Sequence, residues 1–241
     1  MRISYVKTNI VNIFADAIVL PANSMLKEGS GASHDIYEAA GRKQLKNACA
    51  KIGNCEMGSA VPTLAFNLNA KYIIHAVVPK WINGLNGEYD LLSSAYLSAL
   101  QIADVMGCTS IAFPLLASGN NGYNQKLAFQ IAKESIESFE GLNLKSVVLV
   151  LFNDHIVTYA KEQGQVVNEI PFNLHEQAIK QEHRDKVKKM VNDGKEIAQN
   201  FLEDQIQKGL DFLKDEKNRE KILAAGIMLA KEAYKIMKKA N

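Results

Sequence analysis

The chain has 241 residues, of which 47% are hydrophobic and 22% are charged, and its formal net charge is +2. This composition is typical of a globular protein and excludes a disordered or fibrous chain. The net charge is too small to favour a nucleic-acid partner, and no stretch reaches the run of about 18 apolar residues that spans a bilayer.

The N-terminal stretch "MRISYVKTNI" lacks the apolar segment of a signal peptide. The three cysteines, Cys49, Cys55 and Cys108, are odd in number and fit no zinc spacing. We therefore expect reduced thiols and a cytoplasmic protein without a membrane span.

Strand-like and helix-like segments alternate over the first 170 residues. Apolar, β-branched runs predict strands at 2–6, 17–21, 71–78, 110–116 and 146–152, and a further strand, interrupted by Pro62 near a sheet edge, within 56–66. Helical spacing of apolar residues predicts helices at 34–52, 90–106, 124–139 and 154–163. Several strands are apolar throughout, as strands covered on both faces must be. The pattern predicts an α/β layered domain with a largely parallel sheet.

The texture of the sequence changes near Pro171. Residues 1–170 carry 13 Lys and Arg against 14 Asp and Glu, whereas residues 171–241 carry 15 against 12. Apolar residues then recur at helical steps over 175–213 and 218–239. We predict a first domain at 1–170 and a helical extension at 171–241. The extension is typical of a structural pad or a homodimer surface, and its basic end is most simply a solvated face.

Two loops rich in glycine and small side chains each follow an apolar strand and precede a helix. The first lies within "AIVLPANSMLKEGSGASHDI", 17–36, and the second within "FPLLASGNNGYN", 113–124. Such loops at the carboxyl ends of parallel strands form the usual ligand crevice of an α/β sheet, and their backbone amides suit an anionic group such as a diphosphate. Neither contains a P-loop or a dinucleotide fingerprint. Either loop alone is compatible with a plain turn; together they favour a two-walled site.

Three linked motifs make the chain recognisable. They are "ADAIVLPANSMLKEGSGASHDIYEAAG", "AKYIIHAVVPKW" and "SIAFPLLASGNNGYN". Their order resembles the macrodomain family, whose members bind ADP-ribose and its derivatives, and the similarity runs from about Ile3 to about Glu162. The resemblance implies a three-layer α/β/α sandwich around a mixed sheet, with ADP-ribose as ligand and no cofactor.

The resemblance also implies a role for individual positions. Asn23 matches the residue that contacts the distal ribose, although a strand-end cap would look the same. The loop around that ribose and one phosphate is Gly29, Gly31, Ala32 and Ser33; the second phosphate loop is Ser118, Gly119, Asn120, Asn121, Gly122 and Tyr123. The adenine end is Asn9, Ile10 and Phe152, the last of which a core position would also explain.

Several positions depart from the family pattern. Asn9 replaces the usual Asp for the adenine amino group; its side-chain carbonyl can accept that hydrogen bond without charge assistance. Leu20 and Pro21 replace the more usual Asn and Ala. Glu28 and Ser30 interrupt the glycine run, and the charge of Glu28 should weaken diphosphate binding unless it points away.

The catalytic prediction depends on Ser33, which stands where the hydrolase branch carries an acidic residue. A serine hydroxyl is a poor base. Catalytic candidates are Asn23 to fix the ribose, with Asp35 or His34 to orient water, although favourable charge at a helix start is a sufficient and preferred reason for Asp35. No histidines have metal-ligand spacing, and no nucleophile elbow occurs.

We therefore expect a cytoplasmic, bacterial macrodomain protein that binds ADP-ribose or an ADP-ribosylated molecule, with binding ahead of fast hydrolysis. The enzyme version is an ADP-ribosyl hydrolase or an O-acetyl-ADP-ribose deacetylase. The alternative is an interaction protein in which the domain is ligand-blind and the helical extension acts through a partner, RNA or self-association.

Overall fold

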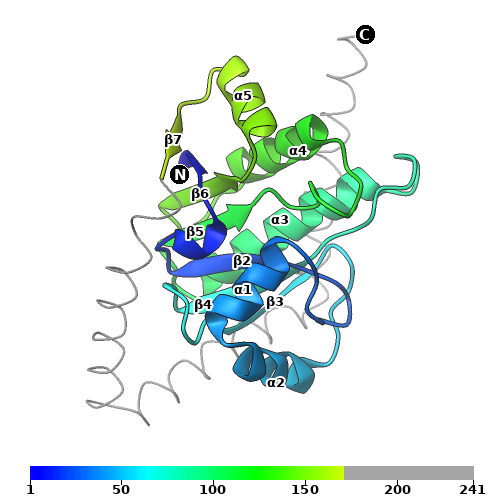
Figure 1. Ribbon diagram of the computed structural model, residues 1–241, viewed down its shortest axis with the longest axis vertical. Helices are drawn as coiled ribbons and strands as arrows, with labels where there is room; N and C mark the ends of the chain where they lie inside the picture. Colours follow the sequence, from blue (N-terminus) through cyan, green and yellow to red (C-terminus); the bar gives the residue numbers. More distant parts are fainter. Residues whose placement is uncertain (171–241) are drawn as a thin grey trace.

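A seven-stranded sheet forms the centre of the protein in a computed structural model that describes residues 1–170 (Figure 1). The predicted helical extension, 171–241, lies outside the described residues. The strand order is β3-β4-β2-β5-β6-β1-β7. The strands are β1 (Arg2–Lys7), β2 (Ala17–Ala22), β3 (Ala60–Leu64), β4 (Tyr72–Val77), β5 (Ser110–Pro114), β6 (Ser146–Leu151) and β7 (Val167–Glu169). All neighbouring strands pair in parallel except β3, which is antiparallel to β4, so the sheet is mixed.

Helices cover both faces of this sheet. They are η1 (Ile10–Asn12), α1 (Ala32–Ala40), α2 (Arg42–Ile52), α3 (Glu88–Val105), α4 (Gln125–Glu137) and α5 (Asp154–Glu162). One buried cluster joins the sheet to α3, α4 and α5, and the other joins it to η1, α1 and α2. Strand β2 serves both, because Val19 belongs to the first cluster and Ile18 and Leu20 to the second. The predicted three-layer α/β/α sandwich and its doubly buried strands are confirmed.

The elements differ from the sequence prediction in two places that bear on the site. The helix predicted over 34–52 is two helices, α1 and α2, because Gly41 takes a φ of 97°. This left-handed backbone favours glycine, and a Cβ at Gly41 would also lie 2.5 Å from Oε1 of Gln44, so the Gln44 side chain would have to move. The short strand β7 and the helix η1 were not predicted. The strand that contains Pro62 is β3, at the sheet edge as expected.

The carboxyl ends of the central parallel strands meet along one edge of the sheet (Figure 1). Strand β2 lies between β4 and β5, and β6 lies between β5 and β1. The segments that follow these strands therefore share one crevice. Behind it His75 is fully buried, and Thr63 Oγ1 lies 2.9 Å from its Nε2; burial lowers the pKa of His75 to about 3. No helix in the described part is long and apolar enough to cross a membrane.

Candidate functional site

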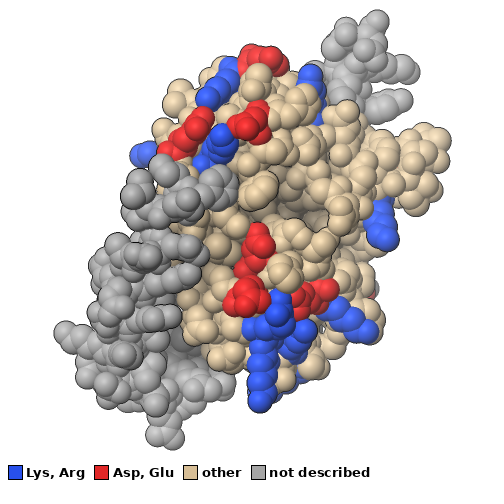
Figure 2. Space-filling model, in the orientation of Figure 1, with Lys and Arg blue, Asp and Glu red and all other residues tan. Residues whose placement is uncertain are grey.

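A cavity of about 860 Å³ occupies this crevice. The segments after β1, β2, β4, β5 and β6 line it. Figure 2 shows the face hollowed at this place, with acidic and basic side chains gathered below the hollow, over α1 and α2. The volume falls in the range of small-molecule sites.

Thirteen of the residues that the sequence singled out line the cavity: Asn9, Ile10, Asn23, Gly29, Gly31, Ala32, Ser33, Asp35, Ser118, Gly119, Asn120, Asn121 and Phe152. His34, Gly122 and Tyr123 are not among the lining residues. His34 faces away from it, toward Glu28. The Tyr123 side chain is buried, and its hydroxyl donates to the carbonyl oxygen of Glu88. The structure thus brings Asn23 and Asp35 to the cavity but not His34.

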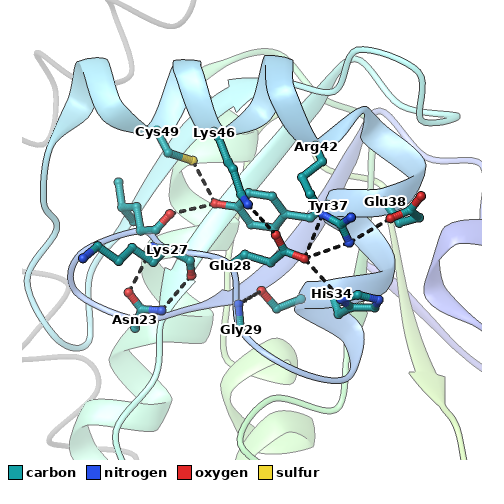
Figure 3. Close-up of polar contacts among 12 residues, drawn as sticks. Asn23, Lys27, Glu28, Gly29, His34, Tyr37, Glu38, Arg42, Lys46 and Cys49 are labelled. Carbon is teal, nitrogen blue, oxygen red and sulfur yellow. Dashed lines mark hydrogen bonds and ion pairs between the residues drawn. The ribbon is translucent and has the colours of Figure 1, made fainter.

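The first loop, residues 23–31 between β2 and α1, is held by its own polar contacts (Figure 3). The Asn23 amide donates to the Lys27 carbonyl at 2.7 Å and accepts from the Lys27 backbone N–H at 3.1 Å. The buried Tyr37 hydroxyl donates to the Leu26 carbonyl at 2.7 Å. Asn23 therefore lines the cavity and shapes the loop, and its contact with a distal ribose stays a prediction.

Glu28 turns away from the cavity and anchors the first loop to α1 and α2 (Figure 3). Its carboxylate lies 3.1 Å from His34 Nδ1, and 3.0 Å from both Arg42 Nη2 and Lys46 Nζ. The hydrogen bond from Lys46, helped by Arg42, holds the pKa of Glu28 below its usual value. The negative charge that the sequence placed near a diphosphate is thus neutralised by cations on the far side of the loop.

Ser30 also has a partner. Asn120 Nδ2 donates to Ser30 Oγ at 2.7 Å, which joins the first loop to the loop on the opposite side of the cavity. The serine in the glycine run therefore links the two walls.

Ser33, at the position where the hydrolase branch carries an acidic residue, has a structural role. Its side chain is 2% exposed, and its Oγ accepts a hydrogen bond from the Gly29 backbone N–H at 3.0 Å. The hydroxyl therefore supports the turn of the first loop, and as an uncharged group it does not supply a general base.

Asp35 pairs with the other end of the cavity. Its Oδ2 accepts from Asn9 Nδ2 at 2.8 Å, and Asn9 Oδ1 accepts from the Val11 backbone N–H at 3.2 Å, which caps η1. Since Lys7 and Leu151 are register partners, the segments after β1 and β6 emerge side by side. Asn9 and Ile10 thus lie near Phe152, whose side chain is 62% exposed and is not the core residue that the alternative interpretation required.

The second loop, residues 115–124 between β5 and α4, is held by uncharged contacts. The Asn121 side chain donates to the Pro79 carbonyl at 2.9 Å, and the Trp81 backbone N–H donates to the Asn121 carbonyl at 2.7 Å. Ala117, in the cavity wall, takes a φ of 61°, a left-handed conformation that is costly for a non-glycine residue. The surrounding packing holds this loop in a preformed shape.

A third wall, which sequence reasoning missed, follows β4. It contributes Val78, Pro79, Lys80, Ile82, Asn86, Glu88 and Leu91, with Met57 beside them. The sequence did contain a signal for this wall, because β4 was predicted as a strand and the segments that follow parallel strands line the ligand crevice. Glu88 organises this wall by accepting backbone N–H bonds from Ile82, Asn83, Gly84 and Asn86. Burial raises the pKa of Glu88, but these donors outweigh it and bring the pKa to about 2.

The charged residues that line the cavity are Asp35, Lys80 and Glu88. Because Lys80 is the one cation among these lining residues, an anion would be bound mainly by backbone amides and by the N-terminal ends of α1 and α4. Within residues 1–170, no cluster of three or more His, Cys, Asp or Glu side chains has the arrangement of a metal site.

Comparison with known proteins identifies this architecture. The family model for the Macro domain matches residues 19–132. A macro domain-containing protein from Caldanaerobacter subterraneus is 42% identical over 157 residues, which cover 64% of this chain and 90% of the relative. The O-acetyl-ADP-ribose deacetylase of Escherichia coli is 39% identical over 142 residues, which cover 57% of this chain and 80% of that enzyme.

Solved structures agree with the sequence relatives. The Oceanobacillus iheyensis macrodomain with ADP superimposes with a TM-score of 0.62 at 30% identity, covering 66% of this chain and 87% of that one. The Trypanosoma brucei macrodomain in complex with ADP-ribose gives a TM-score of 0.58 at 28% identity, covering 68% of this chain and 69% of that one. On sequence and fold, the chain belongs to the macro domain family.

Proposed function

We propose that this protein binds ADP-ribose, free or attached to another molecule, in the cavity between its first and second loops. The observation that carries the proposal is the opposition of two amide-rich loops across one cavity, in a chain whose relatives include macrodomains solved with ADP and with ADP-ribose. The distal ribose lies at Asn23 and the first loop, the diphosphate between the two loops, and the adenine near Asn9, Ile10 and Phe152.

Calorimetric titration of the full chain with ADP-ribose tests this proposal. Saturable binding with 1:1 stoichiometry is expected. A Gly119→Val variant should bind more weakly, because the added side chain keeps the diphosphate away from the backbone amides of the second loop. Folded wild-type protein that releases no heat and shows no saturation would refute the proposal.

We further propose that binding dominates over hydrolysis. Ser33 provides no carboxylate, and Asp35 is hydrogen-bonded to Asn9 rather than to the first loop. A bound ribose therefore meets no ionised general base from these two positions, and the protein acts as a reader of ADP-ribose.

Hydrolysis is the second candidate, because relatives at 39% identity are O-acetyl-ADP-ribose deacetylases. Hydrolysis by positioning alone is compatible with a cavity in which Asn23 fixes the ribose and backbone amides stabilise developing charge. Wild type and Ser33→Asp should be assayed in parallel on O-acetyl-ADP-ribose and on ADP-ribosylated protein. Turnover gained only by Ser33→Asp supports the reader assignment; wild-type turnover at the rate of the variant contradicts it.

The wider context of the protein is also a proposal. A bacterial, cytoplasmic setting is supported by the bacterial relatives and by three cysteines that remain free thiols. We propose that residues 1–170 are the ligand-binding unit and that residues 171–241 support self-association rather than nucleic-acid binding. Comparing oligomeric state and ADP-ribose affinity with and without residues 171–241 tests both statements. The alternative of a ligand-blind domain is not favoured by the relatives.

A further inference from the structure

The segment between β4 and α3, residues 78–87, presents apolar side chains to solvent beside the cavity, and we call it the projecting loop. It extends from the body of the domain next to the start of α3 (Figure 1). Ile82 is 70% exposed and Leu85 is 86% exposed. The stretch between Lys80 and Glu88, "WINGLNG", contains no charged residue. Exposed apolar side chains are ordinary on a protein surface when they are scattered singly, but these two share one uncharged projection at the mouth of a ligand cavity.

Polar contacts inside the projecting loop give it a fixed shape. Glu88 is 2% exposed, and its carboxylate accepts four backbone N–H bonds from the loop. The Asn83 side-chain oxygen accepts from the Leu85 N–H at 2.9 Å and from Asn86 Nδ2 at 2.8 Å. The loop is therefore ordered before any partner arrives, and a partner that binds it loses little affinity to the ordering of this surface.

Aromatic packing fixes the base of the loop without using its two exposed side chains. The centroid of the Trp81 ring lies 5.0 Å from that of the Tyr123 ring. Gly84 has a φ of 81°, and a Cβ there would lie 2.9 Å from the Trp81 ring, so the turn packs directly against the indole. Trp81 thus supplies the apolar packing that the loop needs for its own structure. Packing of the loop does not explain why Ile82 and Leu85 are large and apolar.

The projecting loop begins beside the residue assigned to the distal ribose. Strand β4 lies next to β2, on the side away from β1 and β6, and the Val78 N–H donates to the Ala22 carbonyl at 3.2 Å. With the distal ribose at Asn23, a group attached to that ribose leaves the cavity along this loop. Ile82 lines the cavity, whereas Leu85 is not among the lining residues. Apolar surface therefore continues from the cavity onto the outside of the molecule.

We propose, on the basis of the proposed binding of ADP-ribose, that the projecting loop recognises the polypeptide sequence around an ADP-ribosylated side chain. An aliphatic side chain of that polypeptide packs on Ile82 and Leu85, and an acidic side chain pairs with Lys80, which is exposed and is the one cation among the lining residues. A substituent as small as an acetyl group needs only the cavity, which does not include Leu85. The ligand is therefore an ADP-ribosylated protein with apolar and acidic residues near the modification.

The test uses the full chain, free ADP-ribose and a synthetic peptide ADP-ribosylated on a single serine, with a leucine and an aspartate next to that serine. Two companion peptides replace the leucine by serine or the aspartate by asparagine. Wild type is expected to bind the first peptide about 10-fold more tightly than free ADP-ribose, measured by calorimetry. Loss of the leucine should weaken the peptide about 5-fold, and loss of the acid about 2-fold.

Leu85→Ser is the main variant, and Leu142→Ser is its matched control. Leu142 is also 86% exposed, but it lies before β6, at the edge of the sheet opposite the cavity. Leu85→Ser is expected to weaken the first peptide about 5-fold and to leave free ADP-ribose unchanged, whereas Leu142→Ser changes neither. Lys80→Gln should abolish the 2-fold preference for aspartate over asparagine that is expected of wild type, about the contribution of one exposed ion pair.

Five results would overturn the inference. If wild type binds neither free ADP-ribose nor any peptide, the proposed function fails as well. If wild type binds free ADP-ribose and all the peptides equally, recognition by the loop alone fails. Equal losses for Leu85→Ser and Leu142→Ser would show a non-specific apolar effect. A loss of free ADP-ribose as large as that of the peptide would place Leu85 in the nucleotide site. If Leu85→Ser alone changes the oligomeric state or lowers the melting temperature, a second copy or other residues of this chain cover the loop.

Discussion

The two loops that close the cavity are held by different forces. The first loop has an ionic anchor in addition to its neutral hydrogen bonds, since the Glu28 carboxylate pairs with Arg42 and Lys46. The second is fastened by uncharged bonds, such as those of Asn121 to Pro79 and Trp81. Ion pairs weaken with salt and with acid, whereas neutral backbone contacts respond little to either. One cavity therefore has a wall whose position depends on solution conditions and a wall whose position does not.

The largest expected effect is on the first loop, from Asn23→Ala. This change removes both hydrogen bonds to the Lys27 backbone, and it also removes the Asn23 amide from the cavity lining. Because the loop then has to be ordered by the ligand, the loss of two neutral hydrogen bonds sets about 30-fold as the largest expected decrease in affinity for ADP-ribose, measured by calorimetry. The effect should be smaller for ADP, which lacks the distal ribose; equal losses for both ligands would contradict the assignment of Asn23.

Glu28→Gln is next in size and tests the ionic character of the first loop. At low salt it should weaken ADP-ribose binding about 10-fold, because the anchor to Arg42 and Lys46 loses its charge. The difference from wild type should shrink as salt rises, since salt screens the wild-type anchor. A constant difference between low and high salt would show that the ions do not position the loop.

Asn121→Ala is the counterpart in the second loop. It removes one neutral hydrogen bond, to the Pro79 carbonyl, and should weaken ADP-ribose binding about 5-fold. Unlike Glu28→Gln, its ratio to wild type should be the same at every salt concentration. A salt-dependent ratio would remove the distinction between the two loops.

The smallest expected effect is that of mild acid. In the folded protein the pKa of Glu28 lies below its unfolded value of 4.5. The Glu28 carboxylate therefore stabilises the fold above pH 4.5, and this contribution is lost as pH falls through the folded pKa. Between pH 7 and 5 the advantage of wild type over Glu28→Gln in ADP-ribose affinity should therefore change less than about 2-fold. Below pH 4.5 the two proteins should converge, while Glu88, with a pKa of about 2, still holds the third wall. Convergence already at about pH 6 would contradict the Glu28 anchor.

The sequence was sufficient for the layers, the two loops and most of the lining, because strand periodicity and strand ends follow local rules. It was insufficient for the partners of Glu28. On the unbroken helix predicted over 34–52, Lys46 would lie about 18 Å along the axis from His34. The break at Gly41 folds α2 back, so that His34 and Lys46 meet the same carboxylate. The Asn9–Asp35 pair was missed for a similar reason, since its members belong to different elements, 26 residues apart.

Gly41 lies outside the cavity, yet the position of the first loop depends on it. Its turn sets the direction of α2, and α2 supplies the two cations that receive Glu28. A transplant of residues 23–33 into another macrodomain would therefore carry the acid without its counterions and place a bare negative charge beside the diphosphate. To move the binding properties of this loop, the graft has to extend through Lys46, so that the transferable unit is the loop together with both helices.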